Sequence, residues 1–275
     1  MRTETFSTPR PLAVRVKLPR GDVQVETADV EETTVSLTGS SERARQQIEQ
    51  ALVRLDDRGD RDELVVDADT DDFSFGGRIR LSISFGDKDA IRIRVVCPHG
   101  VDLSVETGSA DTRATGRFGS VTTKTGSGDV SVDEVEHDAE VKVASGDVRI
   151  DRVGGSLKVQ TAAGDVAAGP VAGRAQVKTA AGDVNLKEVA SDVAVTSASG
   201  DVVVGAVTQG TVELKSVSGD LVVGIRRGSR VWMDVKTVTG DARSELDAGV
   251  DDDGEGPLVE LKATAMSGDI RIVRA

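Results

Sequence analysis

The chain has 275 residues, enough to bury a sizeable hydrophobic core, yet aromatic residues make up only 2% of it and Tyr is absent. Its net charge of −13 excludes nucleic acid as a partner and disfavours an anionic membrane surface, since phosphate groups would be repelled. Cys97 is the only cysteine, which excludes an intramolecular disulfide. A core with so few rings must be built from Val-sized side chains, and thin, regular β layers suit that inventory.

Residues 1–105 show strand patterns without a regular repeat. Apolar and polar residues alternate over 14–18, and a Pro19–Asp22 turn leads into a second alternating run at 23–25. The same alternation over 79–85 and 91–95 predicts a hairpin. We therefore expect residues 1–105 to form a β-rich region that caps the open end of the next domain.

One helix is expected in this region, over about residues 41–55. Ser40 or Ser41 is a suitable N-cap. The apolar residues that would share one face of this helix are Ala44, Ile48, Ala51, Leu52 and Leu55.

A repeat of 18 residues dominates the rest of the chain. The dipeptide Gly-Asp recurs at this interval with Gly at positions 128, 146, 164, 182 and 200, and again at wider intervals at 219, 240 and 268. Short Val-rich runs with period-two alternation share the repeat: one follows each Gly-Asp and a second lies half a repeat later. The sequence thus predicts an all-β fold whose residues 106–275 form a β-solenoid, with two strands in each coil of about 18 residues.

Each Gly-Asp pair is expected at a corner of the coil. Gly allows a positive φ there, and Asp can accept hydrogen bonds from turn amides. Stacked at about 4.8 Å, neighbouring carboxylates would repel by about 0.9 kcal/mol per pair even at the dielectric constant of water. Amide hydrogen bonds, outward splaying or bound cations must offset this repulsion. A calcium-binding β-roll is the alternative, but its nonapeptide motif is absent from the sequence.

The C-terminal part of the chain departs from the regular repeat. Residues 245–257 are acidic and Gly-rich, which predicts a loop. Ile270–Val273 has the pattern of a final strand, and we expect it to leave the C-terminal end of the solenoid exposed. For Trp232 and Met233 we expect core packing, with an anchor for a partner as the alternative.

No arrangement of residues predicts catalysis. His99, His137 and Cys97 lack the spacing of metal ligands, and neither a nucleophile elbow nor a phosphate-binding loop is present. The Arg20-Gly21-Asp22 triplet matches an integrin-binding motif, but Gly-Asp is so common here that chance explains it. The sequence predicts no catalytic, cofactor-binding or metal site, no cofactor and no small-molecule substrate.

The strand–Pro-x-Gly–strand unit at Leu18–Val25, a second such unit at Val95–Leu103 and the serial Ser-Gly-Asp-Val elements together resemble a bacterial family of unknown function. Its members are β-strand-repeat proteins called "putative adhesins". The resemblance covers nearly the whole chain and implies a solenoid without catalytic residues.

We therefore expect a non-catalytic structural or interaction protein that presents its repetitive surface to a protein partner or to itself. One alternative is an adhesin-like or cytoskeleton-like scaffold that polymerises end to end. A carbohydrate-binding or carbohydrate-cleaving β-helix, with Trp232 on the floor of an acidic groove, is the other. No stretch approaches the roughly 18 apolar residues of a membrane span, and no signal peptide is evident. The expected location is the cytoplasm, or the cell envelope by a non-classical route.

Overall fold

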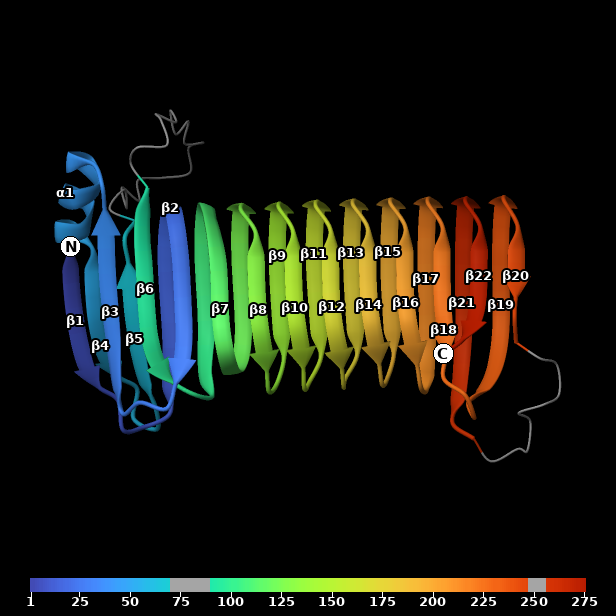
Figure 1. The fold of residues 1–275 in the computed structure, drawn as a ribbon, viewed down its shortest axis with the longest axis horizontal. Helices are drawn as coiled ribbons and strands as arrows, with labels where there is room; N and C mark the ends of the chain where they lie inside the picture. The colour runs from blue at the N-terminus through green and yellow to red at the C-terminus, as the bar shows by residue number, and fades with distance from the viewer. Residues whose placement is uncertain (70–89, 247–255) are drawn as a thin grey trace. The chain divides into compact units, whose positions relative to one another are not determined.

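A computed structural model describes residues 1–69, 90–246 and 256–275. Within them the chain is almost entirely β-strand, with one short helix (Figure 1). It divides into two compact units, Met1–Gly128 and Asp129–Ala275, and each is described by itself. The predicted strand at 79–85 lies outside the described residues.

The first unit is built around two long strands that run side by side. Strand β2 (Leu12–Ala28) pairs in parallel with β7 (Val101–Ser127), from Ala13 opposite Asp102 to Glu26 opposite Thr115. The other strands of the unit are β1 (Arg2–Ser7), β3 (Glu32–Gly39), β4 (Leu52–Asp57), β5 (Asp62–Asp67) and β6 (Ile91–Pro98). The first half of β2 also pairs with β5 and its second half with β6. The domain boundary expected at 105/106 falls within β7, and the capping role of residues 1–105 stays a prediction.

The helix is shorter than the sequence predicted. Helix α1 spans Glu42–Gln50, and the Ser41 Oγ accepts a hydrogen bond from the Ala44 amide at 2.9 Å. It ends because the next residues form β4, which pairs antiparallel with β5. The expected range of 41–55 was therefore wrong at its C-terminal end: Leu52 belongs to a strand and is 45% exposed. Long-range pairing overrode an apolar spacing that suits either structure.

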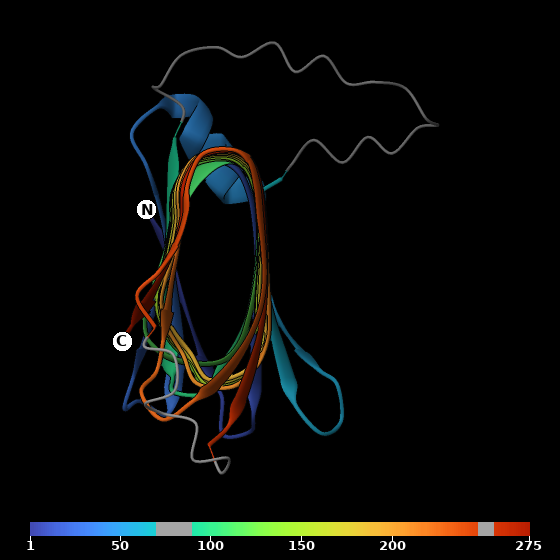
Figure 2. The ribbon, with the colours of Figure 1, turned by 90° about the vertical axis from the view of Figure 1, so that its right-hand side faces the viewer.

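The second unit consists of coils with one strand on each of two faces. Each coil contributes one strand to each of two stacks, and the strands within a stack pair in parallel. Val148 thus lies opposite Val166 in one stack, and Val159 lies opposite Val177 in the other. Seen end on, these coils overlie one another in a flattened oval (Figure 2). One stack comprises β8 (Val130–Val135), β10 (Val148–Val153), β12 (Val166–Val171), β14 (Val184–Val189), β16 (Val202–Val207) and β18 (Leu221–Ile225). The other comprises β9 (Ala139–Ser145), β11 (Leu157–Ala163), β13 (Ala175–Ala181), β15 (Val193–Ser199) and β17 (Gly210–Ser218). The predicted β-solenoid with two strands per coil is confirmed.

The corners follow the prediction made for Gly-Asp. Gly182 has φ +117°, and a Cβ there would lie 2.2 Å from the Gly164 carbonyl oxygen of the preceding coil. The Asp165 carboxylate accepts a hydrogen bond from the Asp183 amide at 2.8 Å, and Asp183 accepts one from Asp201 at 2.9 Å. Each carboxylate thus receives a backbone donor from the next coil, which is one of the offsets to repulsion that the sequence required.

Spatial order departs from chain order at the C-terminal end. Strand β21 (Leu258–Ser267) lies between β17 and β19 (Arg230–Thr239), while β22 (Ile270–Arg274) lies between β18 and β20 (Ala242–Ser244). The last coil in chain order, β21 and β22, therefore stacks directly on β17 and β18. The coil that precedes it in the chain, β19 and β20, stacks on its other side. The expectation of an exposed final strand at Ile270–Val273 was wrong, since Ile270 and Ile272 are buried between two neighbours.

The composition of the two coils explains this order. The inward positions of β21 and β22 are wholly apolar, which suits a coil covered on both sides: Val259, Leu261, Ala263, Ala265, Ile270 and Ile272 are all buried. The coil of β19 and β20 is less suited to a covered position. Its inward residue opposite Ala265 is the polar Thr237, and β20 has only three residues to pair. Among the described residues, β19 and β20 form the outermost coil of this stack.

Candidate interaction surface

The potential catalytic residues do not form a catalytic group among the described residues of either unit. The Cys97 thiol is fully buried, and burial raises its pKa to about 12, so it is not a nucleophile at neutral pH. The His99 Nδ1 lies 3.0 Å from the Thr27 hydroxyl in the first unit. His137 lies in the second unit, in the turn between β8 and β9. Within the described ranges no three His, Cys, Asp or Glu side chains gather as potential metal ligands.

The Arg20-Gly21-Asp22 triplet is part of β2 rather than the tip of a loop. Gly21 is paired on both sides, with Ile91 of β6 and Ala110 of β7. The Asp22 carboxylate is 3.0 Å from the Arg92 guanidinium. The triplet is therefore part of a sheet that is paired on both sides, with its Asp side chain engaged by Arg92.

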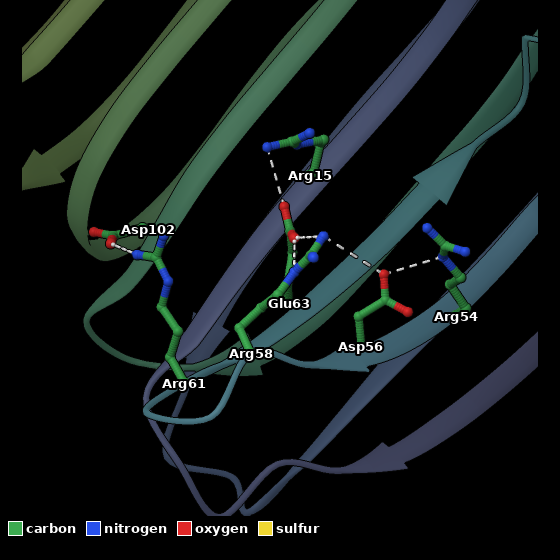
Figure 3. Close-up of polar contacts among 7 residues, drawn as sticks. All are labelled: Arg15, Arg54, Asp56, Arg58, Arg61, Glu63 and Asp102. Carbon is green, nitrogen blue, oxygen red and sulfur yellow. Dashed lines mark hydrogen bonds and ion pairs between the residues drawn. The ribbon is translucent and has the colours of Figure 1, made fainter.

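Charged residues of β2, β4, β5 and the turn between β4 and β5 form a connected network, and a separate ion pair to β7 lies beside it (Figure 3). Arg58 lies 2.7 Å from Glu63 and 3.8 Å from Asp56, and Arg15 approaches Glu63 from β2 at 3.0 Å. Two further pairs, Arg54 with Asp56 and Arg61 with Asp102, complete the set. Because Glu63 is nearly buried and has two cationic partners, the network fastens the β4–β5 hairpin to β2.

The Glu63 carboxyl group of this network does not have the properties of a general acid. The hydrogen bond from Arg58, followed by the charge of Arg15, lowers the pKa of Glu63, although burial acts in the opposite direction. A glycosidase acid requires a raised pKa instead. A nearby hollow of about 470 Å³ is lined by Arg15, Lys17 and Arg54, which each have a carboxylate partner, and also by Lys124.

Exposed apolar side chains of the second unit gather at its outermost end. All large apolar residues that are exposed there belong to three adjacent strands, β17, β21 and β19: Val217, Trp232, Met233, Val238, Leu258 and Met266. We call these six residues, among those that the structure describes, the terminal face. They form two groups, Val217, Val238 and Met266 at one end of the strands and Trp232, Met233 and Leu258 at the other. Exposed apolar groups on neighbouring strands are a feature of interaction sites.

Trp232 is part of this face and not of the core. It lies on the outer side of β19 and is 50% exposed, with the Lys262 ammonium 5.9 Å from the ring centroid. The expectation of core packing was therefore wrong for Trp232. Met233 points to the interior, in the row of Leu261, but it is 41% exposed because β19 belongs to the outermost coil.

Ion pairs occupy the middle of the same strands. Lys236 contacts Asp234 at 2.9 Å on β19, and Lys262 contacts Glu260 at 2.7 Å on β21. On β19 and β21 the terminal face therefore has apolar groups at both ends of the strand and charges of both signs between them, while β17 contributes Val217 at one end. Such a mixture of apolar anchors and polar groups is found at protein interfaces.

A signal for this surface was present in the sequence. The residue two positions before each Gly-Asp points outward, and in the first five coils of the unit after Gly128 it is Ala, Ala, Ala, Ala and then Val217. The last two coils place Val238 and Met266 at this position. Only the spatial order of the strands shows that the three large residues are neighbours.

None of the helices in the described ranges has the length and apolarity needed to cross a membrane.

Two solved structures are similar to this chain, and the first of them supports the fold. A "putative lipid binding protein" from Parabacteroides distasonis is similar over 99% of this chain and 96% of its own, with 14% identity and a TM-score of 0.52. A "putative adhesin" from Bacteroides fragilis covers the same shares of the two chains, with 12% identity and a TM-score of 0.48. At such identities the likeness concerns the fold alone.

Curated proteins gave no match to the sequence. A family model described as Toastrack DUF4097 matches residues 12–273, nearly the full length of the chain. This agrees with the resemblance to a β-strand-repeat family of unknown function that the serial Ser-Gly-Asp-Val elements carry. The chain belongs to the Toastrack DUF4097 family.

Proposed function

We propose that this protein is a non-catalytic interaction scaffold that binds a protein partner through its terminal face. The observation that carries the proposal is the gathering of every large exposed apolar residue of the second unit, within its described residues, on three adjacent strands. On the preceding coils the equivalent outward positions hold Ala, which offers little contact area. The repeated coils would then act as a rigid support for one binding end.

Several features of the described residues support a role without catalysis. The buried Cys97 thiol has a raised pKa, and the nearly buried Glu63 carboxylate is held in its charged form by two arginines. The carboxylates of the corner Asp residues accept hydrogen bonds from backbone amides. This structural role explains why Asp recurs at the corners, and no role in binding a substrate is needed. The carbohydrate alternative required Trp232 on the floor of an acidic groove, whereas Trp232 lies on an outer strand face beside Lys262.

Site-specific photo-crosslinking tests the proposal. A benzophenone amino acid would replace Val238 in the chain expressed in its native cells, and mass spectrometry would identify whatever is crosslinked. The matched control is the same substitution at Ala162, which occupies the equivalent outward position on β11. We expect protein adducts at 238 and few at 162. Equal yields at both positions, or none at either, would contradict a binding role for the terminal face.

A further inference from the structure

We propose that the partner of β19 is β19 of a second copy of this chain, paired antiparallel across a two-fold axis at Val235. The inference rests on the proposed interaction role of the terminal face and names its partner. It is carried by three features of the same strand: an outer edge that no described strand pairs with, the order of its charges and the positions of its exposed apolar residues.

The outer edge of β19 has backbone groups available for pairing. In the part of the chain that the structure describes, β19 pairs only with β21. The Arg230 amide donates to the Pro257 carbonyl on the β21 side at 2.9 Å. Because amides alternate in direction along a strand, those of Val231, Met233, Val235 and Thr237 point away from β21. An unpaired edge of this kind is a template for another strand.

A two-fold axis at Val235 satisfies these groups. Val235 would face Val235 of the second copy, and Met233 would face Thr237, so that residues with outward-directed amides face each other. About six main-chain hydrogen bonds would form over this stretch. The even-numbered residues would form the alternate pairs, whose side chains lie closest together.

The side chains of those alternate pairs are complementary. Asp234 of each copy would lie opposite Lys236 of the other, and Trp232 opposite Val238. Opposite charges and aromatic–β-branched pairs are both stabilising across antiparallel strands. Trp232 is 50% exposed and Val238 is 76% exposed in the single chain, so both would gain cover from the second copy.

Other registers lose this match. An axis at Met233 would put Trp232 opposite Asp234, and an axis at Thr237 would put Lys236 opposite Val238. A shift by a single residue would place each residue whose amide points to the free edge opposite a residue whose amide points toward β21. The backbone hydrogen bonds between the two copies could then not form. The register centred on Val235 is therefore the one that pairs the charges, the apolar groups and the backbone together.

The same arrangement would cover the partly exposed interior of the outermost coil. Val231, Met233 and Val235 point inward in the rows of Val259, Leu261 and Ala263, yet each has some exposure. A second coil stacked on this end would continue those rows. Because the contact is one coil wide, we expect an interface near or below the roughly 1,200 Å² at the lower limit of stable complexes, hence a weak dimer.

Charge reversal combined with sedimentation equilibrium tests the proposal on the purified full chain. We expect a monomer–dimer equilibrium in which Asp234→Lys or Lys236→Asp raises the Kd about tenfold, and in which the double variant restores association. The matched control is Glu213→Lys, which reverses one charge of the equivalent Glu213–Lys215 pair on β17. It should leave the Kd unchanged.

Disulfide trapping tests the register directly. Two Val235→Cys side chains would lie on Cα atoms about 5.5 Å apart, within the range of a disulfide. Val231→Cys is the control on the same edge, because eight residues, about 27 Å, would separate the two copies of position 231. Under mild oxidation we expect covalent dimers of the first variant only, and none of the native chain, whose Cys97 is buried.

The outcomes separate this inference from the proposed function. A monomer at every concentration, or a dimer indifferent to Asp234→Lys, would overturn the two-fold pairing of β19. If photo-crosslinking at 238 then captured a different protein, the interaction role would stand with another partner. If it captured nothing, the interaction role would fall as well.

Discussion

The close stacking at the Gly-Asp corners predicts a large cost for adding one methyl group at Gly182. The native φ of +117° lies in a region that residues with a Cβ avoid, at a cost of about 1–3 kcal/mol. The new Cβ would also lie 2.2 Å from the Gly164 carbonyl oxygen, so the two coils must separate locally. Separation weakens the hydrogen bond from the Asp183 amide to Asp165, worth about 1 kcal/mol. Gly182→Ala should therefore destabilise the second unit by about 2–4 kcal/mol.

Gly228→Ala is the matched control, because it separates backbone strain from stacking. Gly228 also has a positive φ, +83°, but a Cβ there would meet nothing within 4 Å. Only the conformational cost of about 1–2 kcal/mol applies. For a unit of this size, we expect thermal unfolding followed by circular dichroism to show a decrease in Tm of roughly 10 °C for Gly182→Ala and about 5 °C or less for Gly228→Ala.

Midpoints are the appropriate measure, since a stack of repeats need not unfold in a single step. Equal decreases in Tm for the two variants would refute the reasoning, because they would show that the spacing of the coils adds nothing to the cost of the Cβ.

Four changes test other parts of the structure. Asp183→Asn keeps an acceptor for the next amide and removes one charge from the column, so its Tm should equal or exceed that of the native chain, whereas Asp183→Ala should lower it by a few degrees. In the described part of the chain the buried Ser216 hydroxyl has no hydrogen-bond partner, so Ser216→Ala should stabilise the protein by up to about 1 kcal/mol in urea unfolding. Cys97 should resist a thiol reagent at pH 8 until urea is added; fast reaction of the folded chain would contradict its burial. The lowered pKa of Glu63 gives stability that is present above pH 4.5 and lost as the pH falls through the folded-state pKa, so Arg58→Gln should reduce this acid-dependent loss in unfolding measured from pH 6 to 3.

The regular coils were predictable because every level of the sequence repeats together. Gly-Asp marks the corners, and the alternating Val residues indicate which face of each strand is buried, as Val141, Val159 and Val177 confirm. A strand stacked on a copy of itself forms the same contacts as its neighbour, so a period of 18 residues determines both the coil and its register. Amide hydrogen bonds were one of three offsets to carboxylate repulsion that the sequence left open for the Asp column, and the structure shows them.

The spatial order of the last coils was not predictable for the same reason. Any coil with Val-sized inward residues can stack on any other, so the pattern within a coil does not indicate its neighbour. The wider Gly-Asp intervals before 240 and 268 indicated irregularity, but not that β21 lies between β17 and β19. The position of Trp232 depends on that order, which explains why a rule that favours burial of large rings failed there.

The form of assembly depends on which strand edge is free to pair, and among the described residues of this stack that edge belongs to β19. A polymer would join the C-terminal end of one copy to a different surface of the next, which is a heterologous contact that can continue without limit. The proposed pairing at Val235 would join the same edge of both copies, so it would occupy both edges and stop at two. The charges of β19 favour this closed form, since Asp234 meets Lys236 only when the strands run antiparallel about that axis. The end-to-end polymer alternative, which assigned growth to Ile270–Val273, would therefore need a second contact in addition to β19, because β22 is already paired on both sides.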